Sequence, residues 1–360
     1  MLQFLFAPIV LFTLIVGINQ GDVGGMGRLG RKTILWYLLT TAIAMIVGIA
    51  VASVLAPGTG MQIDSQAVVE VKSEASIVQV ILSIVPDNLF AAFVDMNMLG
   101  IIFIAVTFGI ALLKLRDSPV YGDAAKQVLT VVDGLNAATM MIMRGVLHYL
   151  PIGIFAIVAG TVAKQGADTI TSLAGMVLVL YIALFVHAGL YVLAMLVSGV
   201  KLGNFIRHAR TPVVTAFATQ SSSGTLPITM NAASRMGLSD RVSSFILPLG
   251  ATINMDGAAI RIAISAVFAA NVIGMPLDLM QMMQIVIVGT LATIGTAGVP
   301  GAGIVMIATV FAQVGLPIET VALLAAIDAL VGMGATALNV TGDLVGAAII
   351  GCSEKDDASE

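Results

Sequence analysis

Two Asn and Asp pairs lie in otherwise apolar stretches of the sequence, Asn254 with Asp256 and Asn339 with Asp343. An ionised carboxylate in an apolar medium is strongly destabilised unless a cation or hydrogen-bond donors accompany it. The pairs therefore predict that a cation binds beside each carboxylate. The alternative is that these residues only cap interrupted helices, but two pairs in matching places are hard to explain by capping alone.

Oxygen ligands for such a cation are expected from backbone that is unwound beside the carboxylates. Carbonyl and carboxylate oxygens without water suit a small monovalent cation such as sodium. The expected backbone ligands are Gly250, Thr252, Asn254 and Asn339.

Two tips rich in Ser, Gly and Pro indicate a second kind of chemistry. They are Ser221–Ser222–Ser223–Gly224 and Gly298–Val299–Pro300–Gly301, and each interrupts an apolar segment. Short helices that meet at such tips would direct free backbone N–H groups and positive dipole ends at an anion. The tips therefore predict a carboxylate site.

The composition requires that lipid surrounds these elements. Of the 360 residues, 59% are hydrophobic and only 10% are charged, which a water-soluble globule could not cover with polar surface. The net charge of −4 and the scattered Lys and Arg residues argue against a nucleic-acid partner. The single cysteine, Cys352, excludes an internal disulfide. His148, His187 and His208 are far apart, so we expect interfacial or packing roles for them.

The apolar stretches predict an all-α polytopic membrane protein. Residues 2–17 are too short for a full span and look like the second half of a helix, so we expect an incomplete N-terminus. Spanning helices are predicted at about 34–55, 77–113 with a break at Pro86–Asp87, 128–163 with Pro151 inside, and 173–198.

The C-terminal part contains two units of the same design. Residues 211–230 lead into 247–260, and residues 292–307 lead into 327–344. Each unit pairs a segment broken at a tip with a helix interrupted by Asn and Asp. Such paired discontinuous elements predict an inverted-repeat transporter whose site lies near the middle of the membrane.

The basic residues predict the orientation of the chain, because positive charge is enriched on the cytoplasmic side. Most of the Lys and Arg residues fall on one side if the loop after residue 17 is cytoplasmic: Arg28, Arg31, Lys32, Lys114, Arg116, Lys126, Lys201, Arg207, Arg210, Arg235, Arg241 and Lys355. We therefore expect a multi-pass protein of the cell inner membrane with a cytoplasmic C-terminus.

The motifs QSSSGTLP, NMDG, GTAGVPGAG and NVTGD, in this order, resemble the dicarboxylate/amino acid:cation symporter family, the prokaryotic relatives of glutamate transporters. The resemblance extends from residue 2 to about 350. It implies a homotrimeric elevator transporter with two re-entrant hairpins and two broken helices. The resemblance implies four parts. Residues 1–75 would form N-terminal scaffold helices and the first transport-domain helix, and residues 76–200 would form scaffold, trimerisation and transport-domain helices. Residues 201–350 would form the transport core, and residues 351–360 a cytoplasmic polar tail.

The resemblance also implies three sodium sites. One would be formed by Gly250, Asn254, Asn339 and Asp343. A second would lie under the second hairpin at Thr252, Met255, Thr293, Ile294 and Thr296. A third would be formed by Tyr37, Thr40, Thr41, Asn254 and Asp256.

The solute site implied by the resemblance is only partly conserved in residue type. The matching positions are Ser221, Ser222, Ser223, Val299, Gly303, Thr336 and Asn339. Gly332 stands where relatives that carry amino acids have an Asp for the amino group, and Ala335 stands where an Arg binds a side-chain carboxylate. Ala258 replaces a neighbouring Thr.

Arg261 stands where a Tyr is common in the family, and it needs an anionic partner at membrane depth. It would bind a second solute carboxylate across the gap left by Ala335 and Ala258, or pair with Asp256 or Asp343 and imitate a bound cation.

These features predict a sodium-coupled symporter of a small carboxylate, most simply a dicarboxylate. The alternative is a symporter of an acidic or neutral amino acid. A passive channel would not need the buried Asp sites, and an intramembrane enzyme with Ser222 as nucleophile has no nearby base. We therefore expect no enzymatic activity.

Overall fold

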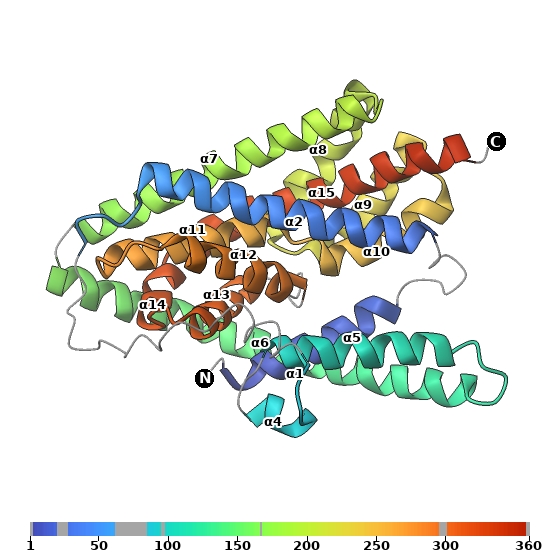
Figure 1. The fold of residues 1–360 in the computed structure, drawn as a ribbon, viewed down its shortest axis with the longest axis horizontal. Coiled ribbons are helices and arrows are strands. Elements are labelled where there is room, and N and C mark those ends of the chain that lie inside the picture. The colour runs from blue at the N-terminus through green and yellow to red at the C-terminus, as the bar shows by residue number, and fades with distance from the viewer. Residues whose placement is uncertain are drawn as a thin grey trace.

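The computed structural model describes residues 3–19, 28–61, 85–94, 98–165, 168–294 and 301–357. Within these ranges all regular secondary structure is helical, which confirms the predicted all-α class (Figure 1). The helices are α1 (Gln3–Asn19), α2 (Arg28–Leu55), α4 (Leu89–Val94), α5 (Met98–Leu115), α6 (Gly122–Gln165), α7 (Asp168–Val197), α8 (Leu202–Thr219), α9 (Ser222–Met236), α10 (Asp240–Ile253), α11 (Asp256–Val272), α12 (Leu279–Ile294), α13 (Ala302–Val314), α14 (Glu319–Ala325) and α15 (Asp328–Asp357).

Four stretches of the described chain are long and apolar enough to cross a membrane. They are Leu29–Leu55, Ile170–Val197, Val242–Val272 and Asp328–Ser353. The outer helices α2 and α7 also carry large apolar side chains on the outside, such as Leu39 and Phe185. Such a surface is unfavourable in water but suits lipid.

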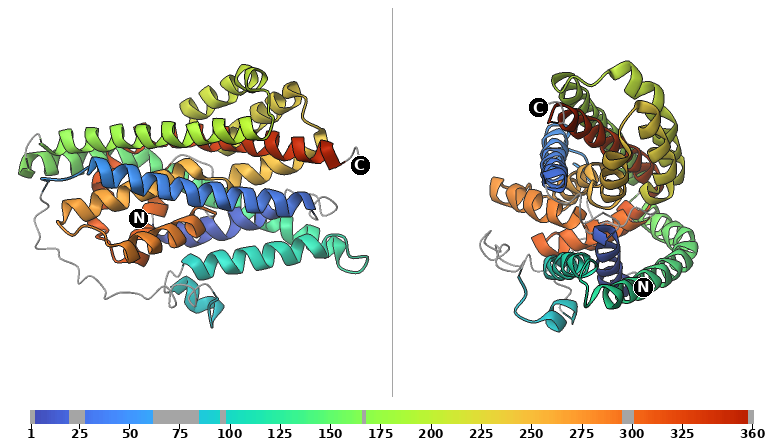
Figure 2. Two further views of the ribbon diagram at one scale, coloured as in Figure 1. Left: turned by 45° about the horizontal axis from the view of Figure 1, so that its top comes forward. Right: turned by 90° about the vertical axis from the view of Figure 1, so that its right-hand side faces the viewer.

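Helix α11 forms the centre of the protein. Every residue from Asp256 to Val272 except Asn271 is buried. The helix contacts α2, α7, α12, α13 and α15, and Figure 2 shows most of these helices running along the long axis of the molecule. Helices α1, α5 and α6 contact one another and lie together on the lower side of the view in Figure 1.

The first predicted broken segment is a helix pair formed by α8 and α9, which we call the first hairpin. Gln220 ends α8 in the left-handed region at φ 52°, and its backbone N–H donates to the Ala216 carbonyl. Ser221 then caps α9, because its side chain accepts the backbone N–H of Gly224. Only two residues connect the helices, so the tip is tightly defined.

The second predicted broken segment corresponds to α12 and α13, which we call the second hairpin. Its predicted tip lies outside the described residues except for Gly301, which has a φ of +83° and precedes α13.

The two helices predicted to be interrupted by Asn and Asp differ from each other. The chain leaves the helical conformation at Asn254 and Met255, between α10 and α11, as predicted. The second interruption was placed wrongly, since α15 is helical through Asn339 and Asp343 and the break precedes it at 326–327. Gly250 and Thr252 are also helical rather than unwound.

The physical reason is that tertiary hydrogen bonds satisfy these polar side chains, so the helix does not have to open. The side chains of Asn339 and Asp343 bond to Gly257 and Asn254, respectively. Pro151 likewise leaves α6 continuous. Helix α15 also continues into the predicted polar tail.

Close packing of α2 on α11 depends on Gly48. A Cβ at Gly48 would lie 2.7 Å from Ala263 Cβ and 3.1 Å from the Ile260 carbonyl oxygen. We therefore expect Gly48→Ala to cost about 1–3 kcal/mol of stability through overpacking, measured as a lower midpoint of thermal unfolding in detergent. Gly189→Ala is the control, because no atom lies within 4 Å of a Cβ at Gly189. An unchanged midpoint for Gly48→Ala would contradict this packing.

Candidate cation and solute site

Asp343 is the centre of a buried polar cluster between α10, α11 and α15. The carboxylate accepts a hydrogen bond from Asn254 Nδ2 at 2.9 Å, and the same amide nitrogen donates to the Asn339 carbonyl at 3.0 Å. Asn339 Oδ1 accepts the backbone N–H of Gly257 at 2.7 Å, so it satisfies one of the free N–H groups in the first turn of α11. The helical break and α15 are thus joined by side-chain amides.

The absence of a side chain at Gly250 leaves space for the carboxylate of Asp343. A Cβ at Gly250 would lie 2.5 Å from Asp343 Oδ1 and 2.6 Å from the hydroxyl oxygen of Tyr37. The tyrosine hydroxyl donates to the Ile246 carbonyl at 3.2 Å. Gly250, Asn254, Asn339 and Asp343, predicted to share one cation site, therefore lie in one cluster.

Asp256 is fully buried at the first turn of α11, where the positive end of the helix dipole favours a carboxylate. Thr41 donates to Oδ1 at 2.6 Å, and Tyr191 donates to Oδ2 at 2.6 Å. His187 Nε2 lies 3.1 Å from Oδ2. The structure therefore brings Thr41 to Asp256 as predicted, whereas Thr40 bonds to the Tyr37 carbonyl.

The Asn254 side chain has an unused acceptor in this cluster. Its Oδ1 is buried and has no hydrogen-bond partner among the described residues. A buried amide oxygen without a donor is costly in the protein alone, but it suits a cation ligand. The donor set of carboxylates, amide oxygen and hydroxyls therefore fits a hard monovalent cation.

The residues predicted for a second cation site are only partly described. Thr252 Oγ1 donates to the Leu249 carbonyl, and Thr293 Oγ1 donates to the Thr290 carbonyl. Met255 Sδ lies 3.2 Å from Asn339 Nδ2. Thr296 and the side chain of Ile294 lie outside the described residues, so this set stays a prediction.

The first hairpin brings an unpartnered hydroxyl to the site. Ser222 is only 2% exposed, and its Oγ has no hydrogen-bond partner among the described residues. Ser221 and Ser223 flank it at the start of α9, where the positive end of the helix dipole favours an anion. Val299 of the second hairpin lies outside the described residues. The described tip thus offers the Ser222 hydroxyl and a helix N-terminus, and the carboxylate site stays a prediction.

The tip of the first hairpin meets α15 at Gly332. A Cβ at Gly332 would lie 2.5 Å from Gln220 Oε1, so the Gln220 side chain uses the room that a side chain at Gly332 would need. Thr336 lies one turn further along α15 and is half-buried. Ala335 and Ala258 are buried where α15 approaches α11, and the backbone of Ala335 leaves no room for a Cβ at Gly257.

Arg261 has a different partner from the two that the sequence suggested. Its guanidinium forms a buried ion pair with Asp328 at the start of α15, not with Asp256 or Asp343. The guanidinium also lies against Gly303 of α13, where a Cβ would collide with it. The pairing with Asp256 or Asp343 was therefore wrong, and the Arg261 charge is neutralised inside the protein.

The sequence reading missed three residues of the site, His187, Tyr191 and Gln220. His187 is 1% exposed and faces Asp256, which excludes the interfacial alternative of its predicted interfacial or packing role and adds a polar contact that was not predicted. His187 and Tyr191 are four residues apart on α7, with ring centroids 4.7 Å apart. A helical face with His and Tyr at membrane depth was the available signal. Gln220 is the first residue of the QSSSGTLP motif, but nothing in the sequence indicated that it lies over Gly332.

Residues 1–352 match the Sodium:dicarboxylate symporter family. The chain belongs to this family. It is 31% identical to a proton/sodium-glutamate symport protein of Geobacillus stearothermophilus, over 97% of this chain and 84% of the relative. It is 32% identical to a proton/glutamate-aspartate symporter of Escherichia coli, with 97% and 82% covered.

A human relative, neutral amino acid transporter B(0), is 31% identical over 97% of this chain and 71% of its own length. Membership of the sodium:dicarboxylate symporter family confirms the resemblance inferred from the four motifs. The chain is thus a membrane protein of a cation-coupled symporter family and not an enzyme, which rejects Ser222 as a catalytic nucleophile.

The Arg261 and Asp328 pair provides a test of the site geometry. Removal of one partner leaves an uncompensated buried charge, so we expect Arg261→Gln or Asp328→Asn to cost about 3–5 kcal/mol. The double variant should recover much of this loss in thermal unfolding. The exposed pair Asp123 and Lys126 is the control, and its removal should have little effect. Additive losses in the double variant would contradict a direct ion pair.

Proposed function

We propose that this protein is a sodium-coupled symporter of an amino acid. The observation that carries the cation part is the buried cluster of Asp256 and Asp343 with the unpartnered Asn254 Oδ1. Two buried carboxylates within one polar cluster repel each other and are stabilised when cations bind. Cation binding thereby becomes energetically linked to the state of the neighbouring hairpins.

The solute carboxylate is assigned to the first hairpin and α15. Ser222 Oγ is buried and has no hydrogen-bond partner among the described residues, and the N-terminus of α9 adds a positive dipole end. The named relatives transport glutamate, aspartate or neutral amino acids, all of which carry an α-carboxylate. These features support a carboxylate as the common element of the solute.

The position of Gln220 favours an amino group as the second feature of the solute. Its amide oxygen lies over Gly332, at the place where the resemblance led us to expect an Asp for the amine. An amide oxygen accepts a hydrogen bond from an ammonium group, so the missing Asp does not by itself exclude an amino acid. This interpretation replaces the dicarboxylate that we expected from the sequence.

The ion pair of Arg261 with Asp328 favours a solute without a second carboxylate. Its guanidinium already has Asp328 as a buried partner, and it packs directly against Gly303 of α13. A solute carboxylate would have to displace Asp328 and leave that carboxylate buried and unpaired. We therefore favour an amino acid with an uncharged side chain over a dicarboxylate or an acidic amino acid.

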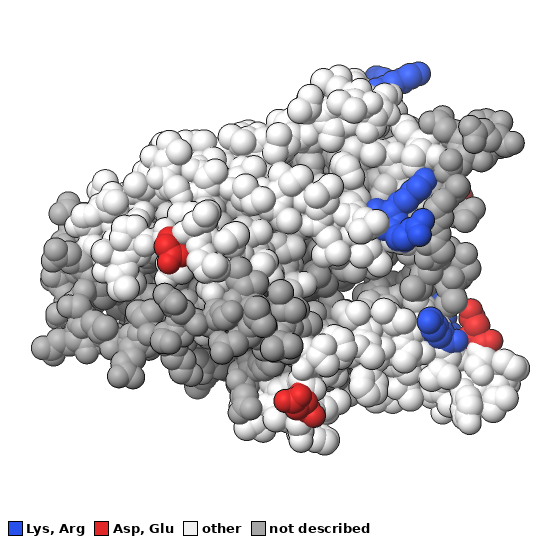
Figure 3. Space-filling model, viewed as in Figure 1, with Lys and Arg blue, Asp and Glu red and all other residues white. Residues whose placement is uncertain are grey.

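The larger assembly follows the family expectation and remains part of this proposal. It comprises a homotrimer in the inner membrane, with scaffold parts in 1–75 and 76–200 and an elevator core in 201–350. In the view of Figure 3, the visible Lys and Arg side chains gather at the right-hand end, where the C-terminus lies in Figure 1. This distribution supports a cytoplasmic C-terminus.

The proposed function is tested by uptake into proteoliposomes. The panel contains neutral amino acids, acidic amino acids and dicarboxylates of four carbons, each with and without a sodium gradient. We expect a neutral amino acid to be the best solute and its uptake to require sodium. Uptake driven equally well by a proton gradient without sodium would reject sodium coupling, and preference for a dicarboxylate would reject the amino-acid assignment.

The variant Gln220→Ala tests the amine contact in the same assay. Loss of a hydrogen bond to a charged group costs about 1.5–3 kcal/mol, so the apparent KM should rise by about 10-fold to 100-fold. Gln127→Ala on the exposed face of α6 is the matched control and should leave KM unchanged. A KM that is unchanged in Gln220→Ala would contradict the proposed contact.

A further inference from the structure

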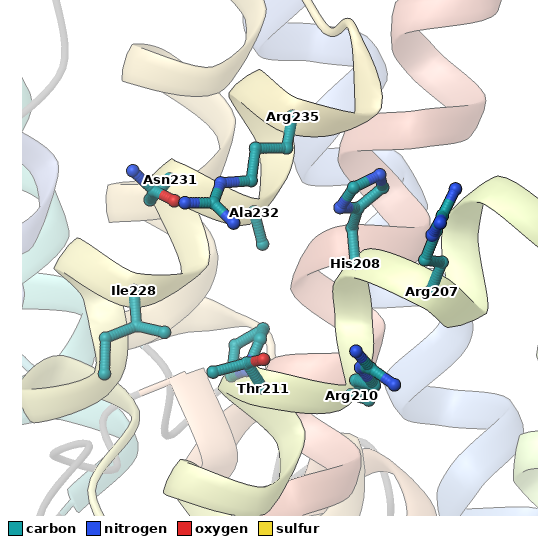
Figure 4. A pocket seen from close by; sticks show the side chains of 9 residues that line it. Arg207, His208, Arg210, Thr211, Ile228, Asn231, Ala232 and Arg235 are labelled. Atoms are coloured by element: carbon teal, nitrogen blue, oxygen red, sulfur yellow. The ribbon is translucent and has the colours of Figure 1, made fainter.

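A cavity of about 320 Å³ lies between the two helices of the first hairpin, away from its tip. Figure 4 shows His208 and Thr211 of α8 and Asn231 and Arg235 of α9 on the two sides of the gap. Its full lining is Arg207, His208, Arg210, Thr211, Pro212, Ile228, Asn231, Ala232 and Arg235. The size is at the lower end of the range for small-molecule sites.

The lining is strongly cationic. Of the described residues that line it, three are arginines, Arg207, Arg210 and Arg235, and none is a carboxylate. Among the described residues none of these arginines forms an ion pair or a hydrogen bond. Three guanidinium groups around one cavity repel each other unless an anion is present. The charge pattern therefore favours an anionic ligand.

The positions of the lining residues along α8 and α9 show how both helices contribute to the cavity. Arg207, Arg210 and Thr211 lie on one face of α8, at i, i+3 and i+4, and Asn231 and Arg235 are four residues apart on α9. Buried Pro212 and Ala232 form an apolar floor under this polar rim. A cationic rim above an apolar floor suits an amphiphile with an anionic head.

Guanidinium groups bind phosphate oxygens through pairs of parallel hydrogen bonds, and Asn and Thr add neutral donors. Basic pockets between helices on the cytoplasmic side of membrane proteins bind anionic lipid head groups. We propose that this cavity binds a phosphate group, and the apolar floor favours the head group of an anionic phospholipid over free phosphate. This inference does not rest on the identity of the transported solute.

Binding of such a group would connect the two helices of the hairpin whose tip carries Gln220 and Ser222. Arg207 lies 13 residues before Gln220, which corresponds to about 20 Å along α8. The cavity is therefore separate from the solute site. Its occupant would stabilise the hairpin without contacting the solute.

The experiment measures thermal unfolding of the purified full-length chain in detergent with three additives. They are a short-chain phosphatidylglycerol, the same chain length of phosphatidylcholine, and inorganic phosphate. The pocket variant combines Arg207→Gln, Arg210→Gln and Arg235→Gln. The control variant removes equal charge outside the cavity by Arg31→Gln, Lys114→Gln and Lys126→Gln, and native mass spectrometry counts the lipids that each protein retains.

We expect phosphatidylglycerol to raise the unfolding midpoint of the wild type and of the control variant, with weaker effects of the other additives. In the pocket variant the apparent affinity should fall at least about tenfold, and one retained lipid should be lost. If phosphate alone gives the same arginine-dependent shift, the source is free phosphate and the lipid assignment is overturned.

Equal shifts in the pocket and control variants would show a general charge effect and overturn the site. The same holds if the wild type shows no shift and retains no anionic lipid. Should the triple variant fail to fold, the single variants Arg210→Gln and Arg235→Gln replace it. Each single variant should then weaken the phosphatidylglycerol effect, whereas an unchanged effect in both would reject the proposal.

Discussion

The structure depends on keeping two carboxylates, Asp256 and Asp343, in the interior of a protein that is surrounded by lipid. Neither carboxylate can reach water, so the surrounding helices must supply donors or a cation. Thr41, Tyr191 and His187 supply contacts to Asp256, whereas among the described residues Asp343 accepts a side-chain hydrogen bond from Asn254 alone. Asp343 therefore has the greater need of a bound cation.

This constraint determines the arrangement of the core. The chain leaves the helical conformation at Asn254 and Met255, and the amide of Asn339 satisfies the first turn of α11 from the neighbouring helix. Glycines 250 and 257 permit α15 to approach this break closely. The ion pair of Arg261 with Asp328 is a further polar contact between α11 and α15. Polar groups that would be costly separately are thus paired across the helices.

The sequence predicted the all-helical class, an interruption at Asn254, the first hairpin and the family, because these follow from apolar patterning and local motifs, although it extended that interruption wrongly to Gly250 and Thr252. It placed a break wrongly in α15, since Asn339 and Asp343 look like helix breakers until their tertiary partners Gly257 and Asn254 are known. It missed His187 and Tyr191 because their partner is 69 and 65 residues away. The ion pair of Arg261 with Asp328 and the position of Gln220 over Gly332 likewise depend on packing between distant segments, which local sequence does not encode.

We propose that these buried carboxylates bind the coupling cation. The most direct test is equilibrium binding of radioactive sodium to the purified protein without solute, for the wild type, Asp256→Asn, Asp343→Asn and the exposed control Asp133→Asn. We expect saturable binding in the wild type and the control, and an affinity reduced at least about tenfold in each of the two buried variants, equivalent to about 1.4 kcal/mol or more. Sodium binding of equal affinity in all four proteins would contradict it.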